Sequence, residues 1–280
     1  MTDEEMTLVL GGTGKTGRRV AARLAERAVP VRIGSRSADP PFDWERPATW
    51  AAALEGAASV YVTYQPDLAV PQARAAIAEF TEAARRAGVR RLVLLSGRGE
   101  EEARRCEDVV TGSGLEWTIV RASWFQQNFS ESDMLGWVLD GALVVPAGRA
   151  PEPYVSADDI ADVAVAALTG DDHLGRVWEV TGPRSLTFAD VAAEISAATG
   201  REITVIEVPV ERYSQALIDA GVPPEAAELL THLFVTVMDG RNAQATDDVR
   251  RALGREAGDF ADYARAAAAS GVWDVPGAGR

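Results

Sequence analysis

Near the start of the chain stands the stretch Leu8-Val9-Leu10-Gly11-Gly12-Thr13-Gly14-Lys15-Thr16-Gly17. Its apolar first part predicts a β-strand, and the amphipathic segment that begins at Lys15 predicts an α-helix. Between them, the first spaced glycine permits a tight turn, the second lets the backbone approach a pyrophosphate, and the third lets helix and strand pack closely. Free N–H groups at the positive end of the helix attract phosphate. The stretch therefore predicts the first turn of a dinucleotide-binding fold.

The same turn has two other interpretations. Gly14-Lys15-Thr16 also ends the pattern of a P-loop, the phosphate-binding turn of nucleotide hydrolases. That pattern needs a glycine five residues before Gly14, and position 9 is valine. A nucleotide hydrolase is therefore excluded, and a tight turn without a ligand is the remaining alternative.

Short apolar runs rich in β-branched residues alternate with alanine-rich helical stretches. Apolar strands separated by helices are typical of a parallel sheet covered on both faces, and right-handed crossovers make such a sheet doubly wound. The predicted strands are Thr7–Leu10, Val31–Ile33, Ser59–Thr63, Arg91–Leu95, Trp117–Val120 and Val177–Thr181, and the predicted helices are Lys15–Ala28, Thr49–Glu55, Ala69–Ala87, Glu100–Thr111 and Ala157–Leu168. The fold class is therefore α/β, a Rossmann-type doubly wound parallel sheet.

The chain changes character after about residue 182. The segments there predict a smaller, mostly helical C-terminal lobe: Thr187–Thr199, Ile203–Val208, Glu211–Ala220 and Pro223–Met238. Because no linker rich in Pro, Gly and Ser precedes it, this lobe is expected to pack against the carboxyl ends of the strands and not to fold independently. We expect a dinucleotide-binding domain over residues 1–182, of which 123–156 contribute to the substrate side, and a substrate lobe over residues 183–280.

The end of the second predicted strand bears on the choice of dinucleotide. Sites specific for NAD usually place an acidic residue there, on the ribose hydroxyls. Here the chain reads Ile33-Gly34-Ser35-Arg36-Ser37, and the next carboxylate is Asp39. A hydroxyl, a guanidinium and Lys15 can hold a 2′-phosphate by charge-assisted hydrogen bonds. NADP(H) is therefore expected and NAD(H) is less favoured, the alternative being that Arg36 is an ordinary surface residue.

Composition excludes several classes of partner and site. The 280-residue chain has a formal net charge of −14, so it repels nucleic acid and anionic membranes, and no apolar run reaches membrane-spanning length. The single cysteine, Cys106, and the two histidines exclude an intramolecular disulfide and a Cys- or His-based metal site. The acidic start is unlike a signal peptide. We expect a cytoplasmic protein without a metal, monomeric or homodimeric.

Further segments carry a family resemblance. They are the Gly11–Gly17 turn, Leu94-Leu95-Ser96-Gly97, Ser113–Arg121, Trp124-Phe125-Gln126-Gln127-Asn128 and Val155–Ala161. Together they resemble the NmrA-like atypical short-chain dehydrogenases over nearly the whole chain. Within that group they look most similar to bacterial relatives of the ergot-alkaloid (agroclavine and festuclavine) dehydrogenases, which reduce iminium compounds, and to NADPH quinone oxidoreductases. The same group contains non-catalytic proteins that sense NADP and regulate partners, so the resemblance alone leaves enzyme and sensor open.

The lysine content restricts the chemistry. Ordinary short-chain dehydrogenases use a tyrosine as general acid with a lysine four residues later, and Lys15 is the only lysine of this chain. A Tyr–Lys pair is therefore absent and the catalytic group stays unassigned. Hydride transfer to an acceptor that needs little help from a protein acid remains, such as an iminium, an enone or a quinone.

Two sets of site residues are expected. The cofactor contacts are Gly11, Thr13, Gly14, Lys15, Thr16, Gly17, Ser35, Arg36, Thr63 and Ser96. The substrate-pocket residues, placed where a doubly wound fold binds ligands, are Tyr64, Arg98, Trp124, Phe125, Asn128, Tyr154 and His232. Core packing of Trp124, Phe125 and His232 and a backbone-clamping role for Asn128 are the alternatives. The acidic runs Asp158-Asp159 and Glu100–Glu102 are expected at the starts of helices.

The leading hypothesis is an NADP(H)-dependent oxidoreductase that passes hydride to a small unsaturated organic molecule, with a role in secondary metabolism. Two alternatives remain: a non-catalytic protein that senses NADP(H), and an isomerase or cyclase that retains the cofactor. The aromatic residues of the Trp124–Asn128 segment favour a substrate pocket, and the acidic composition argues against direct operator binding by a sensor.

Overall fold

The computed structural model describes residues 5–132, 134–146, 149–219 and 221–275. Contacts divide the chain into two compact units. Unit 1 is Met1–Ala122, Ala157–Val180 and Asp248–Arg255, and unit 2 is Ser123–Ser156, Thr181–Asp247 and Glu256–Arg280. Both units therefore combine segments that are far apart in the sequence.

Unit 1 is built on a six-stranded parallel sheet. Its strands are β1 (Met6–Leu10), β2 (Val31–Gly34), β3 (Ala57–Val62), β4 (Arg91–Gly97), β5 (Glu116–Ala122) and β7 (Arg176–Val180). They lie in the order β2-β1-β3-β4-β5-β7, and every neighbouring pair is parallel. The strand order reverses between β1 and β3, which makes this position the topological switch point of the sheet. The predicted doubly wound sheet is confirmed.

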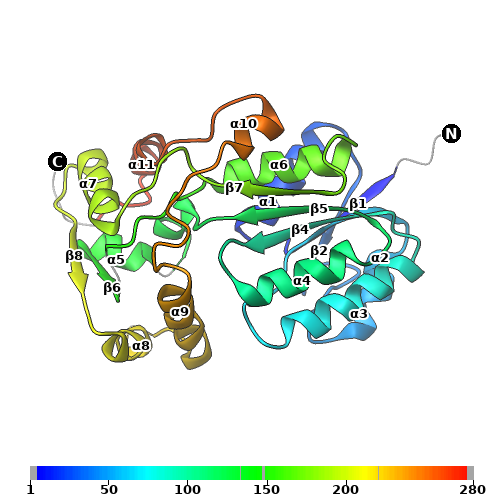
Figure 1. The fold of residues 1–280 in the computed structure, drawn as a ribbon, viewed down its shortest axis with the longest axis horizontal. Helices are drawn as coiled ribbons and strands as arrows, with labels where there is room; N and C mark the ends of the chain where they lie inside the picture. Colours follow the sequence, from blue (N-terminus) through cyan, green and yellow to red (C-terminus); the bar gives the residue numbers. More distant parts are fainter. Residues whose placement is uncertain (1–4, 133, 147–148, 220, 276–280) are drawn as a thin grey trace. The chain divides into compact units, whose positions relative to one another are not determined.

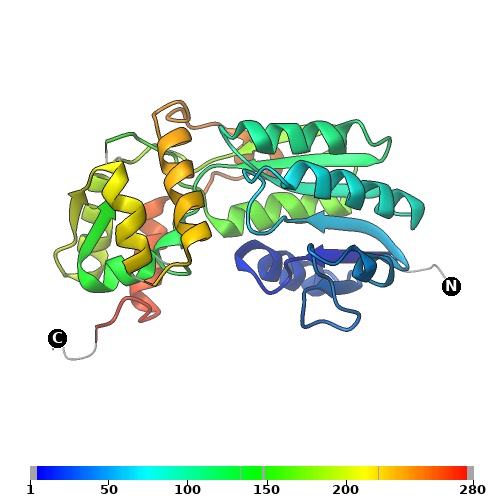
Figure 2. The same cartoon turned by 90° about the horizontal axis from the view of Figure 1, so that it is seen from below.

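Helices cover both faces of this sheet (Figure 1). Helices α1 (Lys15–Glu26) and α6 (Ala157–Thr169) pack together on one face, and α3 (Ala73–Arg86) and α4 (Glu101–Thr111) pack together on the other, where Figure 2 shows them side by side. A 3-10 turn η1 (Pro47–Thr49) and helix α2 (Trp50–Leu54) precede β3, and α10 (Asp248–Leu253) contacts α6 and β7. Because both faces are covered, Leu8, Val60 and Leu92 of the central strands are fully buried.

One helix begins later than predicted. The prediction started it at Ala69, whereas α3 begins at Ala73. Pro71 disfavours helical backbone at Val70, the residue before it, so Leu68 and Ala69 are buried as part of the loop instead. The helix can therefore begin only beyond the proline.

Unit 2 packs helices around a two-stranded parallel sheet of β6 (Ala142–Val145) and β8 (Thr204–Glu207). Its helices are α5 (Met134–Asp140), α7 (Phe188–Thr199), α8 (Val210–Asp219), α9 (Pro224–Thr236) and α11 (Phe260–Ala269), with a 3-10 turn η2 (Gln126–Phe129). The segments predicted after residue 182 correspond to α7, β8, α8 and α9, except that Ala220 lies outside the described residues. No prediction covered α5, β6 or α11.

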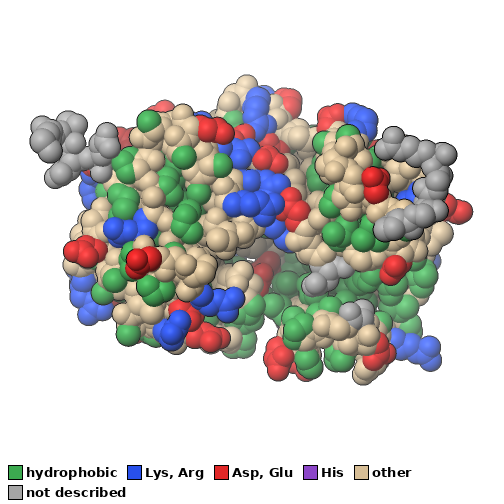
Figure 3. Space-filling model, turned by 180° about the vertical axis from the view of Figure 1, so that it is seen from behind, with side chains coloured by type: hydrophobic (Ala, Val, Ile, Leu, Met, Phe, Trp, Pro, Cys, Tyr) green, Lys and Arg blue, Asp and Glu red, His purple; other side chains and the backbone are tan. Residues whose placement is uncertain are grey.

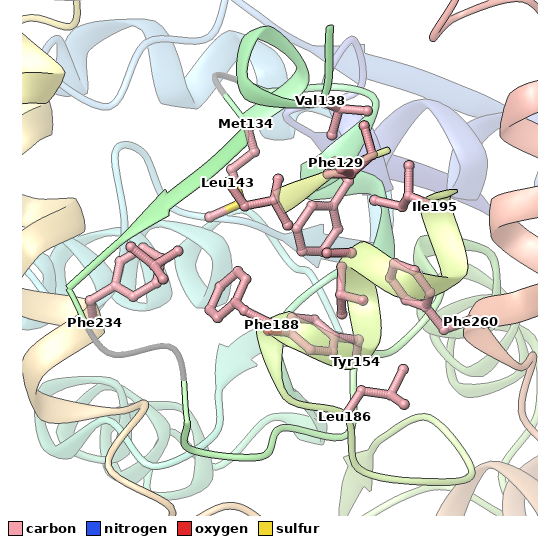
Figure 4. Packing of buried hydrophobic residues seen from close by; sticks show 14 of the residues in the cluster. Phe129, Met134, Val138, Leu143, Tyr154, Leu186, Phe188, Ile195, Phe234 and Phe260 are labelled. Carbon is pink, nitrogen blue, oxygen red and sulfur yellow. The ribbon is translucent and has the colours of Figure 1, made fainter. Parts of the chain in front are cut away.

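Unit 2 has an aromatic core of its own (Figure 4). The Phe129 ring lies edge-on to Tyr154 and to Phe260, with centroids 5.6 Å apart in both pairs, and Phe188 packs against Tyr154 at 6.1 Å. Such pairs contribute about 0.5–1.5 kcal/mol each beyond their buried area. Because these rings come from three separate stretches of chain, unit 2 depends on all three.

Candidate functional site

The glycine-rich turn has the geometry that its sequence predicts. Gly11 has a φ of +62°, a conformation that favours glycine, and the N–H of Gly14 donates to its carbonyl at 2.8 Å. A methyl group added to Gly17 would lie 2.6 Å from the carbonyl carbon of Gly11 and 2.9 Å from the Cα of Gly12. At Gly14 an added methyl would meet only the Gly11 oxygen, at 3.2 Å. A side chain at position 17 would therefore overlap the turn itself, whereas one at position 14 would meet a single oxygen atom at close range.

The start of α1 is suited to an anion. Among the described residues no side chain caps its N-terminus, and its first turn contains no acidic residue. The N-cap residue, Gly14, is extended with φ −82° and ψ 179°. The positive end of the helix dipole therefore meets this turn without a carboxylate to neutralise it.

The switch point of the sheet joins this turn to β3. The Thr63 hydroxyl, one residue beyond β3, donates to the carbonyl of Leu10 at 3.1 Å. A methyl group on Gly11 would lie 2.5 Å from that hydroxyl oxygen. The carboxyl ends of β1 and β3 thus meet at this point. In open α/β sheets, ligands bind beyond such a switch point.

A cavity of about 610 Å³ adjoins the turn in unit 1. Six of the ten predicted cofactor residues line it: Gly11, Thr13, Gly14, Ser35, Arg36 and Thr63. The other lining residues are Gly34, Ser37, Phe42, Asp43, Trp44, Glu45, Gln65 and Pro66. The hydroxyl oxygens of Ser35 and Ser37 lie 3.4 Å apart. The end of β2 therefore presents hydroxyls and a guanidinium to the same space as the glycine turn.

Aromatic side chains wall this cavity. The Trp44 indole N–H donates to the Thr63 carbonyl at 3.0 Å, and its ring lies 4.9 Å from Tyr64 and 5.1 Å from Phe42, centroid to centroid. The neighbouring carboxylate, Asp43, accepts from Arg46 at 2.9 Å. Trp44 lies 19 residues before Thr63, in a segment without regular structure, so no periodic signal in the sequence marked it.

Four predicted cofactor residues do not line the cavity. Lys15, Thr16 and Gly17 lie in the first turn of α1, and Thr16 is buried. Ser96, near the end of β4, donates to Glu107 Oε1 at 2.6 Å in a buried contact. The Ser96 hydroxyl is therefore hydrogen-bonded to the Glu107 carboxylate of α4.

A buried ionic network extends from Ser96 across the carboxyl ends of β4, β5 and β7. Arg121 donates to both Glu107 oxygens, at 2.9 and 2.5 Å, and to Glu179 at 2.7 Å. Arg98, predicted in the substrate pocket, donates to Glu179 at 3.2 Å. Burial alone would raise the pKa of Glu179, but Arg121 and Arg98 hold it below its usual value. The network holds these strand ends together.

Two further carboxyls meet at the same edge of the sheet. Asp67 follows β3 and accepts from the N–H of Ala69 at 2.8 Å. Glu100, directly before α4, folds over Gly97, where an added methyl would lie 2.5 Å from Glu100 Oε2. Oε2 is buried, and no N–H or hydroxyl of the described residues donates to it. Burial raises the pKa of both carboxyls, and at Glu100 the charge of Asp67 raises it further.

The expectation for Glu100 thus changes in one respect. Its neighbours Glu101 and Glu102 lie in the first turn of α4, as predicted, whereas Glu100 precedes the helix and contacts Asp67. Burial and the neighbouring negative charge therefore disfavour the ionised form of Glu100. No local pattern indicates that these two residues lie near each other, because they are 33 residues apart and follow different strands.

The remaining predicted pocket residues belong to unit 2. Trp124 is partly buried, 4.7 Å from the Phe234 ring, and Phe125 pairs with Val155 through backbone bridging. Asn128 is partly buried in η2 and His232 is exposed on α9. Tyr154 is buried in the aromatic core. Trp124 and Phe125 thus adjoin the Tyr154–Val155 segment, and His232 is exposed instead of packed in the core.

On the face drawn in Figure 3, basic and acidic side chains lie among each other instead of forming one broad basic area. Asp158 and Asp159 begin α6, as predicted, and accept from Arg23 and Arg255 at 2.7 and 2.6 Å. No group of three His, Cys, Asp or Glu residues in the described part of the chain could hold a metal ion, and no described helix is long and apolar enough to span a bilayer.

Comparison with known proteins gives a consistent result. Residues 11–171 match a family described as NAD(P)H-binding. The chain is 34% identical to a (4-alkanoyl-5-oxo-2,5-dihydrofuran-3-yl)methyl phosphate reductase from Streptomyces griseus, covering 92% of this chain and 96% of that one. It is 29% identical to a festuclavine dehydrogenase from Aspergillus fumigatus, with the same two coverages. The predicted similarity to the ergot-alkaloid dehydrogenases is confirmed.

Among solved structures, an NADPH-dependent quinone oxidoreductase from Escherichia coli in complex with NADPH superimposes with a TM-score of 0.79 at 20% identity. The superposition covers 92% of this chain and 98% of that one. At this level of identity the likeness establishes the fold, and it agrees with the sheet described above.

Proposed function

This chain belongs to the NAD(P)H-binding family, among its NmrA-like reductases and dehydrogenases, and we propose that it uses NADPH to reduce a small conjugated or iminium-type organic acceptor. The observation that carries the proposal is the cavity that the glycine turn shares with Ser35, Arg36 and Ser37. It combines an uncapped helix N-terminus for a pyrophosphate with a guanidinium and hydroxyls for a further phosphate.

The residues present fit this cofactor. The absence of a side chain at Gly14 lets a phosphate approach the backbone, and the indole of Trp44 offers a flat apolar wall to a base. The preference for NADPH over NADH is inferred from Arg36 and from Asp43, whose carboxylate is already engaged by Arg46. The NADPH bound to the similar oxidoreductase supports the same choice.

The class of acceptor is inferred from the single lysine of the chain and from the names of its relatives. A dihydronicotinamide supplies hydride, and the protein supplies binding, orientation and exclusion of water. Because Lys15 is the only lysine, no Tyr–Lys pair can protonate a simple ketone here. The Streptomyces relative is named for a ring alkene conjugated to carbonyl groups, and the Aspergillus relative for an ergot-type dehydrogenase. Both names fit acceptors that are already electrophilic at carbon.

We assign the substrate side to residues of unit 2 around Trp124 and Phe125. Trp124 is partly buried and lies against Phe234, so its ring can form an apolar wall for a planar acceptor. Asn128 and His232 are proposed as polar contacts. Arg98 and Tyr154 are weaker candidates, because one is engaged by Glu179 and the other is enclosed in the core.

Stopped-flow absorbance of NADPH mixed with a panel of quinones, enones and cyclic iminium salts tests the function. At least one acceptor should oxidise NADPH with saturation kinetics. Trp124→Ala should change the rate or the acceptor preference while the Kd for NADPH stays the same. The matched tryptophan control, Trp44→Ala, should weaken NADPH binding and leave the order of acceptors unchanged.

Two results would contradict this proposal. Tight NADPH binding with no oxidation by any acceptor of the panel would indicate a sensor of NADP(H) instead of a reductase. Weakened cofactor binding in Trp124→Ala with an unaltered acceptor preference would remove Trp124 from the substrate side.

A further inference from the structure

The backbone of the Trp124–Asn128 segment is paired with Val155 within unit 2. The N–H of Val155 donates to the carbonyl of Trp124 at 2.8 Å, and the N–H of Gln126 donates to the carbonyl of Val155 at 2.9 Å. Between these two bonds, Phe125 forms a parallel bridge with Val155. The chain on both sides of Phe125 is therefore fixed to one neighbouring residue.

The side chain of Gln126 makes a second connection. It is 1% exposed, and its Nε2 donates to the carbonyl of Tyr154 at 3.1 Å and to the carbonyl of Gly258 at 3.0 Å. Because both neighbours are acceptors, the NH₂ end of the amide faces them and both of its hydrogens are used. Gly258 directly precedes the N-cap of α11, Asp259. One buried amide thus joins the Trp124–Asn128 segment to two other stretches of unit 2.

We propose that Gln126 is the positioning residue of the substrate side, and that its amide fixes the backbone that carries the Trp124 indole. The inference rests on the proposed reductase function, in which Trp124 forms an apolar wall for the acceptor. The Trp124 ring is partly buried and lies 4.7 Å from the ring of Phe234, centroid to centroid. Because part of the ring is not packed, the position of its backbone must help to set its place. A displacement of about 1 Å in a group that orients substrate can cost about 100-fold in rate.

The next residue in the chain, Gln127, offers a matched comparison. It lies on the same 3-10 turn and is 4% exposed. Its Nε2 donates to the hydroxyl of Ser156 at 3.3 Å, and a hydroxyl can rotate to another partner, whereas the carbonyls that bind Gln126 are part of the backbone. We therefore expect Gln127 to stabilise the turn without fixing the backbone of Trp124.

The first test observes the indole directly and needs neither cofactor nor turnover. The chain has seven tryptophans, so fluorine NMR of protein labelled with 5-fluorotryptophan can follow each of them, and the resonance that Trp124→Phe lacks belongs to position 124. Gln126→Met keeps the length of the side chain without its donors, and it should shift or broaden that resonance by more than the linewidth. The resonance of Trp44, which lies in unit 1, should stay in place. Gln127→Met, the matched control, should leave the Trp124 resonance unmoved.

The second test is a double-mutant cycle on the oxidation of NADPH by 1,4-naphthoquinone. Gln126→Met should lower kcat/KM for the quinone about 10-fold or more, while the Kd for NADPH should change less than about twofold, since the cofactor cavity lies in unit 1. In the Trp124→Ala background the same change should cost less than about twofold, because the side chain through which Gln126 acts is gone. A general loss of stability would instead lower kcat/KM equally in both backgrounds.

Gln126→Glu is the conservative variant. A carboxyl group buried against two carbonyl oxygens retains its proton, because burial and these dipoles disfavour the ionised form, and the neutral group donates one of the two hydrogen bonds. At about pH 6 this variant should therefore lie between the wild type and Gln126→Met in both measurements, and it should approach Gln126→Met as the pH rises and the carboxyl ionises. It also serves as the test variant if Gln126→Met does not fold.

The possible outcomes separate the two proposals. If the wild type reduces the quinone and the Trp124 resonance is the same in Gln126→Met, the positioning role is overturned while the reductase function stands. Equal losses of kcat/KM in the two backgrounds also overturn it, as does a Gln127→Met protein in which the Trp124 resonance moves as far. If the wild type is inert with every acceptor of the panel and the resonance still moves in Gln126→Met, the reductase function is overturned and Gln126 remains the residue that holds Trp124 in place.

Discussion

The glycine-rich turn allows a sharp comparison between two identical changes, Gly14→Ala and Gly17→Ala. An alanine methyl at position 17 would overlap the Gly11 carbonyl oxygen and lie 2.6 Å from the carbonyl carbon, whereas ordinary contacts begin at 3.4 Å, so backbone must move by more than about 0.8 Å. At position 14 the methyl would meet only the Gly11 oxygen, at 3.2 Å, in a backbone conformation that alanine adopts readily.

The expected magnitudes differ accordingly. Overpacking against backbone costs about 3 kcal/mol, and alanine recovers about 1 kcal/mol over glycine inside a helix, so Gly17→Ala should lower the free energy of unfolding by about 2 kcal/mol. Gly14→Ala should leave it within about 0.5 kcal/mol of the wild type. If the methyl displaces two hydrogen bonds between backbone N–H groups and the pyrophosphate, each worth about 1.5 kcal/mol or more, the Kd for NADPH should rise at least about 100-fold.

Urea unfolding and calorimetric titration with NADPH measure the two quantities separately. Gly14→Ala should be as stable as the wild type and bind NADPH poorly, whereas Gly17→Ala should be destabilised. Unchanged NADPH affinity in Gly14→Ala would refute the assignment of this turn to the pyrophosphate. A Gly17→Ala protein as stable as the wild type would show that the turn relaxes without strain.

Three further predictions concern single charged groups. Arg36→Ala should weaken NADPH binding by about 1.5–3 kcal/mol in calorimetric titration, because it removes a charge-assisted contact to the 2′-phosphate, and it should weaken NADH binding much less. Equal losses of binding free energy for the two cofactors would show that Arg36 does not contact the 2′-phosphate. Glu107→Ala should lower the free energy of unfolding by about 3 kcal/mol in urea, since it leaves the Arg121 guanidinium buried with fewer partners, and an unaffected midpoint would contradict this. Arg121 and Arg98 lower the pKa of Glu179. The contribution of ionised Glu179 to stability is therefore present above the unfolded-state pKa of 4.5 and is lost as pH falls through the lower folded-state pKa. The free energy of unfolding of Glu179→Gln at acid pH should accordingly depend less on pH than that of the wild type.

Much of unit 1 could be predicted from the sequence because its signals are local. The strand, turn and helix of Leu8–Gly17 follow from apolar periodicity and from glycines at fixed spacing. Helix α3 shows where local signals mislead. The apolar periodicity predicts a start at Ala69, whereas the helix begins at Ala73, because Pro71 disfavours helical backbone at the residue before it. In unit 2, β6 is only four residues long and its pairing with β8 spans 62 residues, so no local pattern indicated it.

The sequence by itself thus determined the α/β class, the glycine turn and the presence of a single lysine, because these depend on residue type and on neighbours within one or two turns of helix. Only the tertiary structure decided which strand ends meet. The order β1-β3-β4 puts the Thr63 hydroxyl against Gly11 and the Asp67 carboxyl against Glu100. The raised pKa values of these two carboxyls require burial and a neighbouring charge, and both arise only when the sheet is assembled.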